Sequence, residues 1–216
     1  MKKPTPMFPG WLRAWHWVNA FLFLALVATG FALHYGEAGA GGYFRWAVLG
    51  HNATGVACTL AYVFYLASMV WTGHWRQYVP RRPFFRRAAR QVRYYLSDIF
   101  QGGHHPFPAT VVSRFNPLQQ VSYIGAVFLM FPVQIGTGLL LLFPLSVPEK
   151  VASLPGLLPV AIGHSVTAYV FTMFLIVHVY LAITVSEPHT GIRAMLFGDR
   201  KKQGPEGAEG QGPALR

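Results

Sequence analysis

A chain of 216 residues is long enough for one domain. Hydrophobic residues make up 53% of it and charged residues only 12%, a balance that excludes a water-soluble globule and indicates several membrane spans. The net charge of +11 is confined to short segments between apolar runs, which argues against nucleic-acid binding, and the single cysteine, Cys58, excludes an internal disulfide.

Four apolar runs in this chain are long enough to cross a bilayer as helices. Each exceeds the roughly 20 residues that a helix needs to span an apolar layer of about 30 Å. The first run follows a basic start, as a signal peptide does, but it is too long for one and begins among tryptophans, so we expect a retained helix. We therefore predict an all-α, integral membrane four-helix bundle in a single domain of residues 1–202. The predicted helices cover residues 14–35, 46–71, 119–143 and 157–185.

The basic residues indicate how the bundle is oriented. All Lys and Arg except Arg45 and Lys150 lie in the N-terminal segment, in the polar segment 72–118 or beyond the fourth run. The positive-inside rule then puts both termini and the long 72–118 loop in the cytoplasm. Residues 203–216, rich in Gly, Pro and Glu, are predicted to be a disordered tail.

One part of the long loop, residues 83–100, combines several arginines with aromatic residues. Such a segment can form a helix that lies on the anionic lipid surface of a membrane. A solvated loop is an equally good interpretation, and the sequence leaves the two open.

Five histidines lie within the apolar runs, and all but His34, which is at the end of the first run, can be paired by depth. An ionisable side chain inside such a run is costly and indicates function. His164 and His178 are fourteen residues apart, so in a helix they share one face and differ in depth by about 21 Å. By depth, His164 pairs with His51 near the outer side of the membrane. His178 pairs with His16 near the cytoplasm.

Paired histidines in a helix bundle suit one kind of cofactor. Two imidazoles on opposite faces of a flat macrocycle are the axial ligands of a six-coordinate haem, which bundles hold between facing helices. An interhelical hydrogen bond is the alternative for any single histidine. Two pairs at two depths instead predict two b-type haems, with His16, His178, His51 and His164 as the iron ligands.

Small residues near the predicted sites would leave room for a macrocycle. Gly30 lies fourteen residues after His16, and therefore at the depth of the outer site. Three more glycines lie toward the same depth, and the five other histidines are assigned to surface or interface positions. These glycines are Gly55, Gly136 and Gly138, and these histidines are His34, His74, His104, His105 and His189.

Several segments resemble one family of membrane proteins. They are RAWHWVN at 13–19, LGH at 49–51, RFNPLQQ at 114–120 and the His164/His178 pair. Together they are similar to the four-helix di-haem cytochrome b subunits of bacterial respiratory oxidoreductases, which include those of formate dehydrogenase, nickel–iron hydrogenase and thiosulfate reductase. The resemblance covers about residues 10–200. The long loop and the GIRAM segment at 191–195 look most like the thiosulfate-reductase branch.

The resemblance implies where a quinone would bind. In that family a quinone site lies next to the inner haem, and Asn116 and Gln119 match its polar residues. Amides suit a quinone carbonyl because they donate as well as accept hydrogen bonds. The same residues can cap a helix, since Asn before Pro117 is ordinary helix-start chemistry, and both roles can hold together. Candidate partners of the haem propionates, which can equally be interfacial anchors, are Arg13, Arg114 and Arg45.

The function that the resemblance implies is electron transfer in the bacterial inner membrane. The chain would pass electrons between a quinone pool on the cytoplasmic side and a periplasmic catalytic subunit or cytochrome c. It would do so as the electron-transfer subunit of a larger oxidoreductase, with the haems supplying the redox chemistry. No Asp, Glu, Lys or Arg lies deep in the runs, so quinone protons would exchange with the cytoplasm.

Three alternatives remain open. A stand-alone di-haem cytochrome that oxidises superoxide with quinone would have the same helices and ligands. A membrane di-iron enzyme would need several clustered histidines, which only His104 and His105 approach. A transporter is disfavoured because the sequence has neither inverted repeats nor charged, interrupted helix pairs. The sequence also leaves open whether the chain forms an oligomer.

Overall fold

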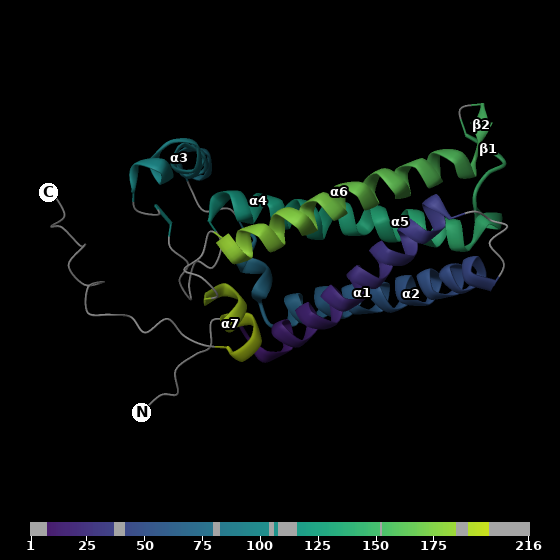
Figure 1. Ribbon diagram of the computed structural model, residues 1–216, viewed down its shortest axis with the longest axis horizontal. Coiled ribbons are helices and arrows are strands. Elements are labelled where there is room, and N and C mark those ends of the chain that lie inside the picture. Colours follow the sequence, from purple (N-terminus) through teal and green to yellow (C-terminus); the bar gives the residue numbers. More distant parts are fainter. Residues whose placement is uncertain are drawn as a thin grey trace, which may run out of the picture.

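Four long apolar helices form the body of the molecule (Figure 1). The computed structural model describes residues 8–36, 42–79, 83–103, 106–107, 116–151, 153–184 and 190–198. Within these residues four helices are long and apolar enough to cross a membrane, and they confirm the predicted all-α integral membrane bundle. They are α1 (Gly10–Tyr35), α2 (Gly42–Trp71), a composite third span (Pro117–Leu142) and α6 (Leu157–Thr184).

Prolines determine where two of the spans begin. α1 begins earlier than predicted, at Gly10, because the extended Pro9 precedes it and the Pro9 carbonyl accepts the amides of Leu12 and Arg13 at 3.1 and 3.2 Å. The third span begins at Pro117, a residue suited to the first turn because no helical partner is needed for its missing N–H. With 26 residues each, α1 and the third span rise about 39 Å, which is longer than an apolar core of about 30 Å, so their ends reach into the interfacial layer.

The third span is interrupted by one π-helical turn. It consists of α4 (Pro117–Gly125), the π-helix η3 (Ala126–Met130) and α5 (Phe131–Leu142). Pro132 cannot donate a backbone hydrogen bond, and a π turn is one way for a helix to absorb that loss. The Tyr62 hydroxyl of α2 donates to the Val127 carbonyl inside this turn at 2.9 Å. The irregular turn is thus held by a neighbouring helix.

The outward faces of the spans are apolar and exposed. α1 packs along α2, and α5 packs along α6. Large apolar side chains such as Phe21, Leu60 and Ile176 point away from these contacts, which is the pattern expected when the surrounding solvent is lipid. Few apolar side chains are buried inside the bundle, and those in the spans are Ala47, Cys58, Tyr62, Tyr65, Met69, Ala126 and Phe171.

The two ends of the bundle differ in their connections (Figure 1). The short antiparallel strands β1 (Lys150–Val151) and β2 (Leu154–Pro155) lie at one end, which the positive-inside rule assigns to the outer side. The other end carries the starts of α1 and α4 together with the short helices. Those short helices are η1 (His74–Gln77), α3 (Phe84–Leu96), η2 (Asp98–Gln101) and α7 (Thr190–Phe197).

The long loop is therefore partly helical, because α3 lies within the segment for which a helix or a solvated loop was expected. The predicted disordered tail, residues 203–216, lies outside the described residues. The extent of the single domain, residues 1–202, stays a prediction.

Candidate haem-binding site

The structure brings together the histidines that the sequence analysis pairs by depth. The ring centroids of His16 in α1 and His178 in α6 are 6.2 Å apart, with an angle of 53° between the ring planes. Those of His51 in α2 and His164 in α6 are 6.3 Å apart, with an angle of 79°. α6 therefore contributes one histidine to each pair, at depths about 21 Å apart.

The separation of the rings in each pair fits one metal ion between them. With metal–nitrogen bonds of about 2.0 Å, two imidazoles bound from opposite sides hold their centroids roughly 6 Å apart. Among the described residues no group of three or more His, Cys, Asp or Glu could hold a metal ion. Each pair thus offers two ligands only, so the other positions must be filled by the group itself, as the nitrogens of a haem macrocycle do.

Threonines fix the ring orientation of the outer pair. Thr29 Oγ1 lies 2.9 Å from His51 Nδ1, and Thr137 Oγ1 lies 3.0 Å from His164 Nδ1. Each hydroxyl already donates its one hydrogen to a carbonyl four residues earlier in its own helix, at 2.7 Å. The threonine oxygens must therefore accept from Nδ1–H, which leaves the Nε2 lone pair of both histidines for a metal.

Two glycines leave space against the same histidines. A Cβ at Gly30 would lie 3.5 Å from His51 Cε1, and a Cβ at Gly138 would lie 3.2 Å from His164 Cε1. Each glycine directly follows the threonine that binds the same ring, so a Thr-Gly pair holds each outer histidine from a neighbouring helix. The glycine packs closely against the ring while the threonine orients it.

Gln134 also faces the outer pair. Its Nε2 lies 3.2 Å from His164 Nε2, and its Oε1 is buried without a hydrogen-bond partner. An amide N–H that donates to Nε2 requires the imidazole lone pair there, which is the form that binds a metal. A buried amide oxygen without a partner is costly. Both observations indicate that a bound ligand would complete the hydrogen bonding and coordination around His164 and Gln134.

The inner pair has a different environment. His16 Nδ1 is buried without a partner, and the ring of Phe174 stacks on His178 with centroids 6.0 Å apart. Arg13, one turn before His16, also has a buried Nε without a partner. An unpaired guanidinium nitrogen at this depth suits a carboxylate such as a haem propionate.

Helix α7 closes the cytoplasmic end beside the inner pair. Trp17 Nε1 donates to the Met195 carbonyl at 3.3 Å, and Arg13 Nη1 donates to the Leu196 carbonyl at 3.4 Å. Gly198 ends α7 with a φ of +74°, and a Cβ there would lie 2.5 Å from Arg13 Nη1. Glycine therefore permits both the turn and the close approach of Arg13.

Comparisons with known proteins agree with this geometry. The family model described as prokaryotic cytochrome b561 matches residues 7–198. The chain belongs to the prokaryotic cytochrome b561 family. YdhU of Escherichia coli (strain K12), which is named as a cytochrome, is 38% identical to it over 191 residues, or 87% of this chain and 71% of YdhU. The protein is thus a multi-pass cytochrome b of the bacterial inner membrane that binds b-type haem.

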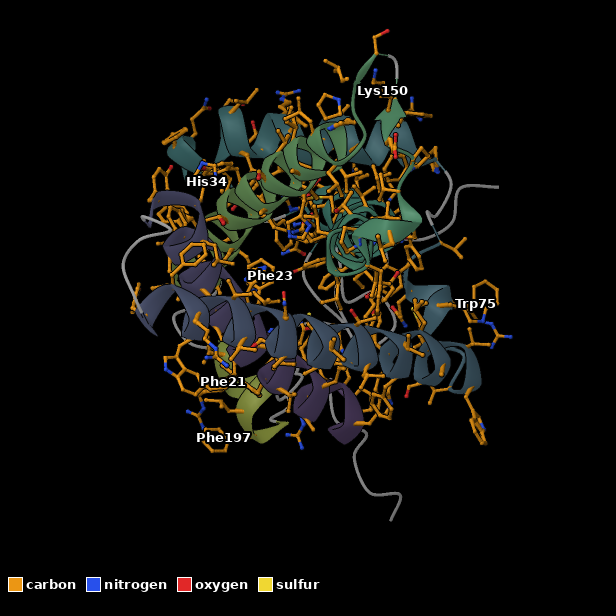
Figure 2. All side chains as sticks on the ribbon, turned by 90° about the vertical axis from the view of Figure 1, so that its right-hand side faces the viewer. Phe21, Phe23, His34, Trp75, Lys150 and Phe197 are labelled. Carbon is orange, nitrogen blue, oxygen red and sulfur yellow. The ribbon has the colours of Figure 1, made fainter. Side chains whose placement is uncertain are left out.

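An aromatic layer separates the two histidine pairs of this cytochrome. Phe171 lies midway between His164 and His178 in α6, is 3% exposed, and contacts Phe23 and Phe131 with centroids 5.5 and 5.0 Å apart. Figure 2 looks along the bundle from the end that carries β1 and β2, and it shows Phe23 in the interior among the helices. Packed side chains therefore lie between the two histidine pairs.

The predicted quinone residues lie at the start of α4. Asn116 Oδ1 accepts the Gln119 amide at 2.8 Å, and Gln119 Oε1 accepts the Asn116 amide at 3.2 Å, which makes a complete capping box. Asn116 Nδ2 also donates to the Tyr95 hydroxyl of α3 at 3.2 Å. Asn116 is buried and its NH₂ already donates to Tyr95, so the more accessible donor for a ligand is the side-chain NH₂ of the half-buried Gln119.

Several other residues that were predicted to be near the haems or at the surface do not contact the histidine pairs. His34 is exposed at the end of α1, His74 contacts Trp11 edge-on in η1, and Arg45 is exposed at the start of α2. A Cβ at Gly136 would meet nothing within 4 Å, and one at Gly55 would only touch Leu26. Arg114, His104, His105 and His189 lie outside the described residues.

Thr29, Thr137 and Gln134 were not predicted from the sequence. A partial signal for the threonines exists, because Thr-Gly pairs occur in three apolar runs, at 29–30, 54–55 and 137–138, each with a glycine noted toward the outer depth. Only the first and third pairs contact an outer histidine, so the pattern alone does not select them. For Gln134, no repeated motif or spacing in the sequence indicates a position next to a histidine. Its role follows only from the distance to His164.

Proposed function

We propose that this cytochrome holds two b-type haems and carries electrons across the membrane between a quinone near the cytoplasmic face and a redox partner on the outer side. His16 and His178 would ligate the inner iron, and His51 and His164 the outer one. The observation that carries the proposal is the distance between the ring centroids in each pair, which is the distance expected for two imidazoles that bind one metal ion from opposite sides. Their depths differ by about 21 Å in a core of about 30 Å, so two carriers cover most of the distance.

The side chains around the pairs would prepare the two sites. Bound haem would supply a carrier that accepts and releases one electron at a time. Thr29 and Thr137 hold the outer imidazoles in the tautomer whose lone pair is on Nε2, and the iron would replace Gln134 as the partner of His164 Nε2. Arg13 would bind a propionate carboxylate through its unpaired Nε. The buried Phe171 layer would keep the two haems apart and exclude water between them.

The quinone would bind at the cytoplasmic end, where the resemblance puts it next to the inner haem. Asn116 and Gln119 lie at the start of α4, on the same end of the bundle as the start of α1. Because their oxygens form the cap, the contribution that we propose is donation from the Gln119 NH₂ to a quinone carbonyl, with Asn116 positioning it. Quinone protons would exchange with the cytoplasm.

The outer partner would be a periplasmic catalytic subunit or a cytochrome c, as in the respiratory oxidoreductases that the chain resembles. The outer histidine pair supports this, because His164 lies about two turns from the start of α6, which directly follows β2. Membership of the thiosulfate-reductase branch stays a prediction within the same proposal.

Quinol-driven reduction of the purified cytochrome tests the proposal. A soluble naphthoquinol is mixed anaerobically with the haem-loaded full chain, and the visible absorbance of b-type haem is followed over time. The wild type should be reduced. His178→Ala should lose the inner haem and the reduction by quinol, while its outer haem is still reduced by dithionite. His34→Ala is the matched control, because its exposed histidine belongs to neither pair, and it should behave as the wild type.

Two results would contradict the proposal. If quinol reduces the remaining haem of His178→Ala at the wild-type rate, the quinone does not react through the inner site. If quinol fails to reduce a wild type that contains both haems, the protein is not quinone-reactive.

A further inference from the structure

Helix α3 of the cytoplasmic loop has three faces of different character. One face packs on the protein, where Gln91 is fully buried, Tyr94 is buried and Tyr95 is half-buried. The Tyr95 hydroxyl accepts a hydrogen bond from Asn116, the cap of α4. This face therefore fixes α3 to the start of the third span.

The second face is apolar and exposed. Phe85 is 86% exposed and Leu96 is 74% exposed, and Val92 and Ala89 lie exposed between them. The spacing of four, three and four residues puts these side chains in one stripe along the helix. A contiguous exposed apolar stripe marks an interaction surface rather than a water-facing one.

The third face, next to that stripe, is basic. Arg86, Arg90 and Arg93 are all exposed, at a spacing of four and three residues. The ion pair found for this stripe joins Arg93 Nε to Asp98, at 3.6 Å and largely exposed. Arg87 is not part of the stripe, since it is turned toward Phe107 with its guanidinium 4.8 Å from the ring centroid.

The position of α3 matches the level of lipid head groups. Figure 1 views α3 almost along its axis, whereas the four spans run across the picture, so α3 lies across the bundle direction. The third span, Pro117–Leu142, has 26 residues and rises about 39 Å, more than the apolar core of about 30 Å. Its first turn, to which Tyr95 ties α3, therefore lies in the interface.

We infer that α3 is an in-plane membrane anchor that binds anionic phospholipid head groups. The stripe of Phe85, Val92 and Leu96 would enter the boundary between acyl chains and head groups, and the arginine stripe beside it would bind head-group phosphates. Guanidinium groups suit this role because they bind phosphate oxygens through two parallel hydrogen bonds. Lipid is the occupant because the stripe lies on a helix that runs across the bundle direction and is tied to the first turn of a span, at the depth where head groups lie.

Quenching of a probe at Leu96 by brominated lipids tests this inference. In a Cys58→Ala background, Leu96→Cys is labelled with bimane, and the haem-loaded full chain is placed in nanodiscs. Phosphatidylcholine or phosphatidylglycerol, brominated in the acyl chain near the head group, is added at equal mole fraction. The label should be quenched by both lipids and more strongly by brominated phosphatidylglycerol. A label at Lys150→Cys, exposed on the outer hairpin, is the comparison site and should show no such preference.

Charge variants separate the arginine stripe from the fold of the helix. Each arginine near an anionic surface favours binding by roughly fivefold. Neutralising the three arginines together, as Arg86→Gln, Arg90→Gln and Arg93→Gln, should abolish the preference for phosphatidylglycerol. Quenching by brominated phosphatidylcholine should persist, because the packing face is untouched. The three corresponding Arg→Lys substitutions keep the charge and should retain the preference.

Three results would overturn the inference. The first is equal quenching by the two lipids in the wild type. The second is absence of quenching by either lipid, which would mean that the stripe faces water or another protein. The third is cross-linking between Leu96→Cys side chains of two copies, which would make this face a contact between protomers.

Discussion

Removing the threonine hydroxyls at the outer histidine pair should change the reduction potential of the outer haem. Thr29→Val and Thr137→Val keep the shape of the side chain but remove the oxygen that lies 2.9 or 3.0 Å from a histidine Nδ1. The hydrogen bond from Nδ1–H to that oxygen makes the imidazole more electron-rich, and a more basic ligand stabilises the oxidised iron. Its loss should therefore raise the potential.

The magnitude follows from the energy of one such hydrogen bond. A net contribution of about 0.5 to 1 kcal/mol, differing between the oxidised and reduced states, corresponds to roughly 20 to 40 mV for a one-electron couple. The inner pair has no threonine partner, and His16 Nδ1 is buried without one. The potential of the inner haem should therefore stay unchanged in both variants.

A potentiometric titration followed at the visible absorbance of b-type haem measures the shift. Performing it in a His178→Ala background isolates the outer haem. Thr172→Val is the matched control, since the Thr172 hydroxyl donates to the Ala168 carbonyl at 2.9 Å in the same way but is not hydrogen-bonded to either histidine of the outer pair. A shift of the outer potential no larger than that of Thr172→Val, or a lowered potential, would show that the threonine hydroxyls do not make the outer ligands more electron-rich.

Two further predictions concern the close contact of Gly138 with His164 and the capping box at the start of α4. Gly138→Val should greatly reduce the content of outer haem, because even a Cβ would lie 3.2 Å from His164 Cε1, whereas Gly136→Val should not, because a Cβ there meets nothing within 4 Å. Equal haem content in the two purified variants would contradict this. Gln119→Glu keeps the oxygen that caps Asn116 but removes the NH₂ group, so the KM for naphthoquinol should rise while thermal stability stays unchanged. An unaltered KM would leave the cap as the role of Gln119.

Hydropathy and charge were sufficient to predict the spans because lipid imposes simple requirements on a sequence. Each span needs a long apolar run, and the cytoplasmic ends keep the arginines and lysines. The histidines could be paired for the same reason, since position within a span gives depth. His164 and His178 share one face of α6 by spacing alone, and the structure puts His51 and His16 beside them.

Contacts between helices were not predictable in the same way. The hydrogen bonds of Thr29 and Thr137 depend on how neighbouring helices are rotated about their axes, and hydropathy contains no information on rotation when all faces are apolar. The π turn at Ala126–Met130 depends on how the chain absorbs Pro132. For α3, the alternation of arginines and aromatic residues allowed a helix, but its packing face became clear only from the burial of Gln91.

The haem content of the purified full chain tests the central claim most directly. A pyridine haemochrome assay, with a reduced-minus-oxidised visible spectrum, measures b-type haem per chain. We expect two haems in the wild type, one after substitution of His51 or His178, and none after substitution of both. A wild type with a single haem per chain, or a haem content that His51→Ala leaves unchanged, would contradict it.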